Sequence, residues 1–398
     1  MTRAATVLAN TLINHGVDRV FCVPGESYLA LIDALYDTPD IDVVTARHEG
    51  GASFMAVADA KITGKPGIVM VSRGPGATNA SIGIHVSQQD AVPVIMFVGQ
   101  VSREDRGRGA FQEIDYVKTY SDMTKWVIEV SDADKISECV QRAFVIAQSG
   151  TPGPVIISLP EDMLLDETNI PALTPVVISQ PKPNINDISK ICEMIAIAKR
   201  PLIIAGGQIG GSAGRNALRT VSETWDIPVA TAWRHQDLFN TNHPNFSCHL
   251  AFNMPPIFKE TLNESDLIIG IGTRLGDVVT QGYKIPSAPQ PIQKLIHIYN
   301  DTKPLGKVFQ TDLAIVADAT KTLELIATID PPEIPKERPD WISKAHALSA
   351  DKFKWELSNA SDGVPFGNVV AHIRDIADDD ANTTVDAGNF ATFIHRLY

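Results

Sequence analysis

The sequence has few cysteines and no long apolar run. Its four cysteines lie far apart in 398 residues and form no CxxC pair, which argues against a disulfide framework or a cysteine metal site. We interpret them as buried thiols in a reducing compartment. No run of about 18 apolar residues occurs, so the sequence predicts no transmembrane helix. Because no apolar segment with a cleavage site follows Arg3, we expect a cytoplasmic protein.

Positive charge is also scarce. Lys and Arg number 34 against 47 Asp and Glu, which gives a formal net charge of −13. Such an acidic surface does not attract nucleic acid or an anionic membrane, so we expect neither as a partner. No internal repeat or low-complexity tract is present. The length and the 44% hydrophobic content instead predict a globular chain of two or three domains.

Helical and extended patterns alternate along the chain. In its first part, four apolar segments are separated by helical patterns: Val20–Val23, Val43–Ala46, Ile68–Ser72 and Val94–Val98. Strands that are apolar on both faces and separated by helices require a parallel sheet covered on both sides. We therefore predict an α/β protein built from tandem doubly wound parallel-sheet domains.

Proline-rich segments divide the chain. Residues 161–184 combine acidic residues with four prolines, a mixture that predicts an extended strap rather than a strand of a sheet interior or a helix. A second proline-rich segment is Pro331–Pro339. We predict an N-terminal domain over residues 1–165, a central Rossmann-like domain over 185–330 and the beginning of a third domain over 340–398.

Four short motifs follow the predicted strands of the first domain. They are Pro24-Gly25-Glu26, Arg47-His48-Glu49, Gly74–Asn79 and Ala110–Glu113, in that order. Ligands of parallel sheets bind at the carboxyl ends of the strands, which is where these motifs fall. Their order and spacing resemble the pyrimidine-binding domain of thiamine diphosphate enzymes, and most closely the acetolactate synthase branch of that family.

The resemblance implies a thiamine diphosphate-dependent enzyme that acts on a 2-oxo acid, with Glu49 as the central catalytic residue. In this family a glutamate just after the second strand bonds the aminopyrimidine ring and promotes loss of the thiazolium C2 proton. Glu49 matches that position, and Gly50 and Gly51 beside it leave room for a cofactor. Taken alone, Glu49 is more typical of a helix N-terminus, where a carboxylate interacts favourably with the helix dipole, and only the other motifs favour the catalytic interpretation.

The other site residues are carried over from the family motifs. We expect Gly74–Asn79 to be a strand-to-helix loop at the pyrimidine end and at a two-fold interface, so the expected assembly is a homodimer or homotetramer. No Lys or Ser/Thr completes a Walker phosphate-binding motif in this loop. The residues expected to contact the cofactor are Pro24, Gly25, Glu26, Glu49, Pro75, Gly76, Asn79, Phe111, Gln112, Gly388 and Asn389.

Glu26 leaves the reaction open between ligation and decarboxylation. Acetolactate synthases generally have glycine here, whereas 2-oxo acid decarboxylases resembling pyruvate or indolepyruvate decarboxylase have an acidic residue that relays a proton. Those decarboxylases also have a His-His pair that this sequence lacks, and Phe111-Gln112 resembles the synthases. We favour ligation, with Glu26 and Gln112 as further catalytic candidates. The alternative interpretation of Glu26 is an acid at a helix start.

The second domain and the end of the sequence complete the expectations. Gly206–Gly211 and Gly272–Asp277 match an FAD site only in part, so we favour a Rossmann-like spacer over FAD. The family binds Mg²⁺ and the diphosphate through a Gly-Asp-Gly motif and a later asparagine, and no Gly-Asp-Gly occurs here. Asp386–Phe390 resembles the first strand and loop of that third domain. We therefore expect this chain alone to lack the Mg²⁺ ligands and activity. From a different class, a non-catalytic α/β binding protein is the alternative.

Overall fold

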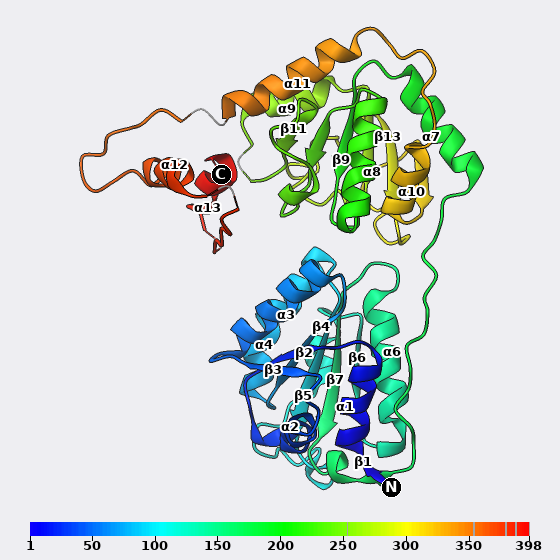
Figure 1. Ribbon diagram of the computed structural model, residues 1–398, viewed down its shortest axis with the longest axis vertical. Coiled ribbons are helices and arrows are strands. Elements are labelled where there is room, and N and C mark those ends of the chain that lie inside the picture. The colour runs from blue at the N-terminus through cyan, green and yellow to red at the C-terminus, as the bar shows by residue number, and fades with distance from the viewer. Residues whose placement is uncertain (253, 353–354, 379, 387, 398) are drawn as a thin grey trace. The chain divides into compact units, whose positions relative to one another are not determined.

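The protein folds into two compact units, Met1–Ser179 and Gln180–Tyr398, shown in Figure 1. The computed structural model describes residues 1–398 except 253, 353–354, 379, 387 and 398. Each unit contains one six-stranded parallel sheet. The predicted α/β fold with tandem doubly wound parallel sheets is confirmed.

The sheet of the first unit has the strand order β3-β2-β4-β5-β7-β6. Its central strands, β4 and β5, are buried along their whole length, as expected for strands of continuous apolar sequence between two helix layers. The strands are β2 (Arg19–Cys22), β3 (Asp42–Thr45), β4 (Gly67–Val71), β5 (Val94–Gln100), β6 (Trp126–Glu129) and β7 (Pro154–Pro160).

Helices cover both faces of this sheet, and the two-residue period of a strand divides its side chains between them. In β4, Ile68 and Met70 pack with α1, α2 and α6, whereas Val69 and Val71 pack with α3, α4 and α5. Figure 1 shows α1 and α6 on the opposite side from α3 and α4. The helices are α1 (Ala4–Asn14), α2 (Leu29–Tyr36), α3 (Glu49–Thr63), α4 (Pro75–Asp90), α5 (Tyr116–Tyr120) and α6 (Ile136–Gln148).

Residues 161–184, predicted as an extended strap, contain two short elements. A 3₁₀ turn, η4, spans Met163–Leu165, and β8 (Glu167–Thr168) pairs antiparallel with β1 (Thr2–Arg3). The hydroxyl of Thr168 is buried and donates to Asp134 Oδ1 over 2.5 Å. The segment therefore holds the start of the chain before it continues, without regular structure, from residue 169 to 184.

The sheet of the second unit has the strand order β11-β10-β9-β12-β13-β14. From β9 the sheet grows first to one side, through β10 and β11, and then to the other, through β12, β13 and β14. This change of direction is the switch point of a doubly wound sheet. The strands are β9 (Pro201–Ala205), β10 (Val229–Thr231), β11 (Phe246–His249), β12 (Leu267–Ile271), β13 (Lys294–Tyr299) and β14 (Leu313–Val316).

The second sheet is also covered on both faces. Alternate residues of β9 separate into two cores: Ile203 packs with α7, α8 and α10, and Ile204 packs with α9. The helices are α7 (Ile185–Ile197), α8 (Gly211–Thr224), α9 (Pro256–Glu264), α10 (Ala319–Ile326), α11 (Arg338–Lys352), α12 (Phe366–Ile376) and α13 (Ala391–Leu397).

A fully buried arginine fixes the start of α11 to this unit. The guanidinium of Arg338 donates to the carbonyls of Ile195, Ala198 and Trp225, at the carboxyl ends of α7 and α8. Carbonyls at a helix carboxyl end lack a full set of intrahelical partners, although that of Ile195 also accepts from the Ala198 N–H over 3.2 Å, and a cation is favourable there. Burial lowers the pKa of Arg338 from its ordinary value.

Two local expectations were wrong. Gly74–Asn79 is not a loop, because α4 begins at Pro75, where proline suits the first helical position. Only Gly74, with φ of 62°, lies outside the helix. Asp386 and residues 388–390 contain no strand, and Ala387 lies outside the described residues.

Candidate functional site

The first motif is fixed by close packing against the end of β4. A Cβ on Gly25 would lie 2.6 Å from Ser72 Cβ, so only glycine permits this approach of the two segments. Pro24 and Gly25 connect β2 to the 3₁₀ turn η1, which spans Glu26–Tyr28. The Glu26 side chain is exposed at this turn. The turn therefore presents Glu26 at the carboxyl end of β2.

Ser27 joins this turn to two neighbouring strands. Its buried hydroxyl accepts a hydrogen bond from the Arg73 N–H over 3.0 Å and shares a second with the Ser72 hydroxyl over 2.9 Å. Gly99, near the end of β5, lies so close that a Cβ would be 2.1 Å from Ser27 Oγ. Ser27 thus sets the spacing of the first motif from the ends of β4 and β5.

Glu49 is the first residue of α3 and directly follows the loop after β3. The preceding residue caps the helix, because His48 Nδ1 accepts from the Gly50 N–H over 3.0 Å. Glu49 Oε2 accepts from the Asn79 side-chain amide over 2.9 Å, which joins α3 to α4. A Cβ on Gly76 would lie 3.3 Å from Glu49 Oε1. The carboxylate is therefore held by one oxygen, and small residues surround the other.

Gly74 brings the third motif against the fourth. A Cβ here would lie 2.8 Å from the Cβ of Gln112, and the positive φ is one that glycine adopts without strain. The Gly74 N–H donates to the hydroxyl of Tyr116 over 3.0 Å, and that hydroxyl donates in turn to the Gly99 carbonyl over 3.4 Å. Burial raises the pKa of Tyr116 to about 12, so the hydroxyl stays protonated at neutral pH.

Phe111 and Gln112 lie on the segment between β5 and α5. Phe111 is a large apolar side chain that is 79% exposed. Gln112 has a φ of 63°, which is uncommon for a residue with a side chain. The structure therefore brings Pro24–Glu26, Glu49, Pro75–Asn79 and Phe111–Gln112 to the same edge of one sheet.

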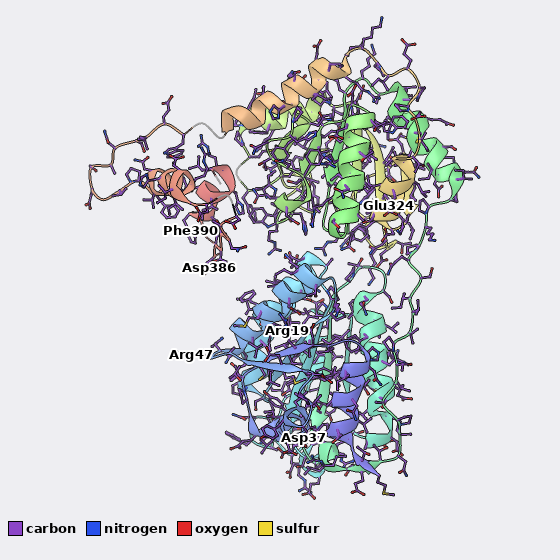
Figure 2. All side chains as sticks on the ribbon, viewed as in Figure 1. Arg19, Asp37, Arg47, Glu324, Asp386 and Phe390 are labelled. Carbon is purple, nitrogen blue, oxygen red and sulfur yellow. The ribbon has the colours of Figure 1, made fainter. Side chains whose placement is uncertain are left out.

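Charged residues surround this edge. Arg73 follows β4, and its Nη1 pairs with Glu161 Oε2 over 2.7 Å beyond the end of β7. In the strand order β5 lies between these two strands, so the Arg73 side chain extends across the end of β5. Arg47, two residues before Glu49, is exposed and points outward (Figure 2).

Gly388 and Asn389 belong to the second unit. They form the turn that leads into α13, where the Asn389 carbonyl accepts from both the N–H and the hydroxyl of Thr392. Figure 2 labels Asp386 and Phe390, which flank this turn. A Cβ on Gly388 would lie 2.6 Å from Cε1 of Phe390, so the aromatic ring occupies the space beside this glycine.

The glycine-rich turn after β9 does not suit a dinucleotide phosphate. The N–H of Gln208 donates to the Gly272 carbonyl over 3.1 Å, and the N–H of Gly210 donates to Thr320 Oγ1 over 2.9 Å. The N–H of Ile209 donates to Gly206. A phosphate bound at such a turn requires free backbone N–H groups, and these three are already used.

Sequence reasoning missed Ser27 and Tyr116, whose hydroxyls connect the motifs. Both are buried, and neither stands at a recognisable motif position. A serine directly after Glu26 and a tyrosine three residues after Glu113 are the only signals in the sequence, and neither indicates which strand the hydroxyl will contact.

Two classes of feature are absent from the described part of the chain. No group of three or more His, Cys, Asp or Glu residues there is placed to hold a metal ion. No helix among the described residues is long and apolar enough to cross a membrane.

Comparison with known families agrees with the geometry of both units. Residues 2–119 match the family described as "Thiamine pyrophosphate enzyme, N-terminal TPP binding domain". Residues 188–326 match "Thiamine pyrophosphate enzyme, central domain". The first match contains all four motifs at the edge of the first sheet, and the second contains the second sheet.

Matches to individual relatives cover more of the chain. This chain is 30% identical to the acetolactate synthase large subunit of Lactococcus lactis, over 100% of this chain and 69% of that protein. It is 32% identical to the probable acetolactate synthase large subunit of Methanocaldococcus jannaschii, over 87% of this chain and 59% of the relative. It is 31% identical to the isozyme 3 large subunit of Escherichia coli, over 81% of this chain and 57% of the relative. The chain belongs to the acetolactate synthase large-subunit family of thiamine pyrophosphate enzymes.

Proposed function

We propose that this chain is part of a thiamine diphosphate-dependent enzyme that ligates 2-oxo acids, as its family membership implies. The observation that carries the proposal is the placement of Glu49. One carboxylate oxygen is held by Asn79, and the other lies beside Gly76, at the edge of the sheet where ligands of parallel sheets bind.

The residues at this edge fit the aminopyrimidine end of the cofactor. Bound thiamine diphosphate supplies a nucleophilic carbon, the thiazolium C2, for attack on the 2-oxo acid. Glu49 Oε1 would hydrogen-bond a ring nitrogen, and the hydrogen bond from Asn79 to Oε2 would orient the carboxylate. Gly76, whose Cβ would lie 3.3 Å from Glu49 Oε1, leaves space beside that oxygen. Pro24, Gly25 and Pro75 would line the site next to it.

Glu26 supports decarboxylation as the second candidate. Its exposed carboxylic acid stands at the same edge and could deliver a proton to a reacting carbon, which would release an aldehyde. Phe111 and Gln112 support ligation, because they present an apolar ring and an amide where a second substrate would enter. We favour ligation, with Gln112 as the residue that orients the second substrate.

Further parts of the proposal concern cofactors and setting. We propose Mg²⁺ as the partner of the diphosphate and Gly388–Asn389 as a contact to it. FAD fits poorly, because the N–H groups of the glycine turn after β9 have protein acceptors. Residues 185–330 would then be a structural domain between catalytic ones. No disulfide joins the four cysteines, which fits a reducing, cytoplasmic setting.

The test is Glu49→Gln in the complete protein. We expect the fold to be retained and C2 proton exchange of bound thiamine diphosphate, followed by NMR, to slow by roughly 10²–10⁴-fold. Glu138→Gln, an acid in the first turn of α6, is the matched control and should leave exchange unchanged. Unaltered exchange in Glu49→Gln with normal cofactor binding would remove Glu49 from the reaction.

A further inference from the structure

The segment Arg106–Glu113 is closed into a ring by one carboxylate. Glu113 Oε1 accepts from the Gly107 N–H over 2.7 Å and from the Arg106 guanidinium. Glu113 Oε2 accepts from the N–H groups of Gly109 and Ala110 over 3.1 and 3.2 Å. The side chain is only 11% exposed. The Gly107 N–H first, and then Ala110 and Arg106, lower the pKa of Glu113, so it is ionised at neutral pH.

The ring is tied to the sheet through Arg106. Its Nε donates to Glu129 Oε1 over 2.9 Å at the end of β6. Glu129 Oε2 accepts from the Gln100 amide over 3.2 Å and from the Ser158 hydroxyl over 3.3 Å. These two residues belong to β5 and β7, so one chain of hydrogen bonds joins three strand ends to Glu113.

Phe111 and Gln112 lie inside this ring. Phe111 is 79% exposed and therefore lacks packing that could fix its ring. Gln112 has a positive φ, a strained conformation that persists only where the surrounding structure holds the backbone. The Glu113 side chain supplies that restraint, because it joins the residue after Gln112 to the backbone N–H groups of Gly107, Gly109 and Ala110 before it.

We propose that Glu113 is a positioning residue: its carboxylate preorganises the Arg106–Glu113 ring and so fixes Phe111 and Gln112 for the second substrate. The ring itself follows from the contacts above, whereas its effect on a substrate rests on the proposed function. Preorganisation of this kind lowers the ordering cost that a ligand meets on binding.

An isosteric change tests the carboxylate. Both oxygens of Glu113 face donors, so Glu113→Gln must point its amide N–H₂ at the Gly109 and Ala110 N–H groups or at Gly107 and Arg106. Neither orientation satisfies the ring. Glu104→Gln is the matched control, because Glu104 is an exposed acid in η2 (Arg103–Asp105) of the same segment.

The experiment measures amide hydrogen exchange and steady-state kinetics in the complete protein. We expect Glu113→Gln to raise exchange over residues 107–112 by about tenfold or more while the β4 and β5 peptides stay protected. KM for the second 2-oxo acid should rise severalfold with a smaller change in kcat, and Glu104→Gln should match the wild type in both measurements.

The outcomes separate the ring from the function. Unchanged exchange in Glu113→Gln overturns the inference outright, and faster exchange with an unchanged KM overturns the positioning role while the proposed function stands. If the wild type consumes no 2-oxo acid, the proposed function fails and exchange alone decides whether Glu113 holds the ring. If Glu113→Gln does not fold, Arg106→Lys, which removes the fork to Glu113 and Glu129, is measured in its place.

Discussion

At the scale of single residues, the position of Glu26 decides between two reactions. Its carboxylic acid is exposed at the turn after β2, where it could protonate a reacting carbon before a second substrate arrives. The turn is held in place, because Gly25 is packed against Ser72. The outcome therefore depends on the Glu26 carboxyl group rather than on motion of the turn.

We expect ligated product to exceed aldehyde when the complete wild-type protein is given pyruvate. Glu26→Gly should lower the aldehyde fraction further, and Glu26→Gln, which keeps the volume but removes the acid, should have the same effect. Product analysis by gas chromatography makes the measurement. Aldehyde as the main wild-type product, with ligated product only in Glu26→Gly, would support the decarboxylase instead.

The motifs at the site could be predicted from sequence, but the contacts that hold them could not. The position of Glu49 could be predicted, because the apolar strand before it and the helical pattern after it are local signals. Ser27 and Tyr116 act through partners up to 46 positions away, such as the Arg73 N–H that bonds Ser27. Contacts of this range depend on the strand order, which a single sequence does not contain.

At the scale of elements, two glycines in the α3–α4 pair have opposite roles. A Cβ on Gly83 of α4 would lie 2.3 Å from Ser53 Oγ and 2.8 Å from the Ser53 carbonyl carbon in α3. A Cβ on Gly51 of α3 would meet nothing within 4 Å. Close packing of α3 against α4 thus requires glycine at position 83 but not at position 51.

We expect Gly83→Ala to destabilise the chain by about 1–3 kcal/mol, because the helices must separate. Gly51→Ala should stabilise it by about 0.5–1 kcal/mol, because alanine loses less backbone entropy in a helix. Urea unfolding of the chain, monitored by circular dichroism, compares the two. Equal stability of Gly83→Ala and wild type would show that α4 shifts without cost.

His297 makes the second unit sensitive to acid. The side chain is buried in β13, its Nε2 donates to the Thr273 carbonyl over 2.9 Å, and burial lowers its pKa from the ordinary 6.5. Below pH 6.5, His297 therefore binds a proton in the unfolded chain more readily than in the folded unit. Stability is kept above that pH and lost as the pH falls below it.

The expected result is a falling urea midpoint for the second unit between about pH 7.5 and 5.5. His297→Gln, whose amide can still donate to Thr273, should remove much of this slope even if it lowers stability at every pH. Glu223→Gln is the control for His243, a partly buried histidine whose Nε2 lies 3.0 Å from Glu223 Oε1. An identical slope in His297→Gln would contradict the assignment.

Elements were predictable where apolar runs are uninterrupted. The predicted strand Val94–Val98 lies within β5, which spans Val94–Gln100. In contrast, β11 was missed, because Ser247 and His249 break its apolar pattern although both are buried in the fold. The start of α4 was missed because glycine and proline at its first turn indicate a loop in sequence, whereas tertiary packing makes them helical.

At the scale of the whole molecule, an apolar surface on α3 and α4 indicates self-association. Phe54 and Met55 are 41% and 40% exposed on α3, and Ile82 is 55% exposed on α4. These helices pack against each other where Gly83 meets Ser53, so the three exposed apolar side chains lie on two neighbouring helices. Such areas mark protein–protein contacts more often than free surface.

We expect the complete protein to be a dimer or tetramer that Phe54→Asp weakens by at least about tenfold, because a charge would be buried without a partner. Tyr36→Asp is the control, since Tyr36 is 87% exposed at the end of α2. Sedimentation velocity over a concentration series measures both. A Phe54→Asp protein that sediments like the wild type would place the interface elsewhere.

The pairing of β1 with β8 has a consequence for synthesis on the ribosome. Thr2 pairs with Thr168, and the two are 166 positions apart. At roughly 5–20 residues per second, about 8 to 33 seconds of translation separate them. During that interval the first strand has no partner, and β6 and β7 are missing from the sheet edge next to β5. The nascent first unit therefore exposes an open, apolar sheet edge until its last strands emerge, which makes it a substrate for chaperones that recognise extended apolar chains.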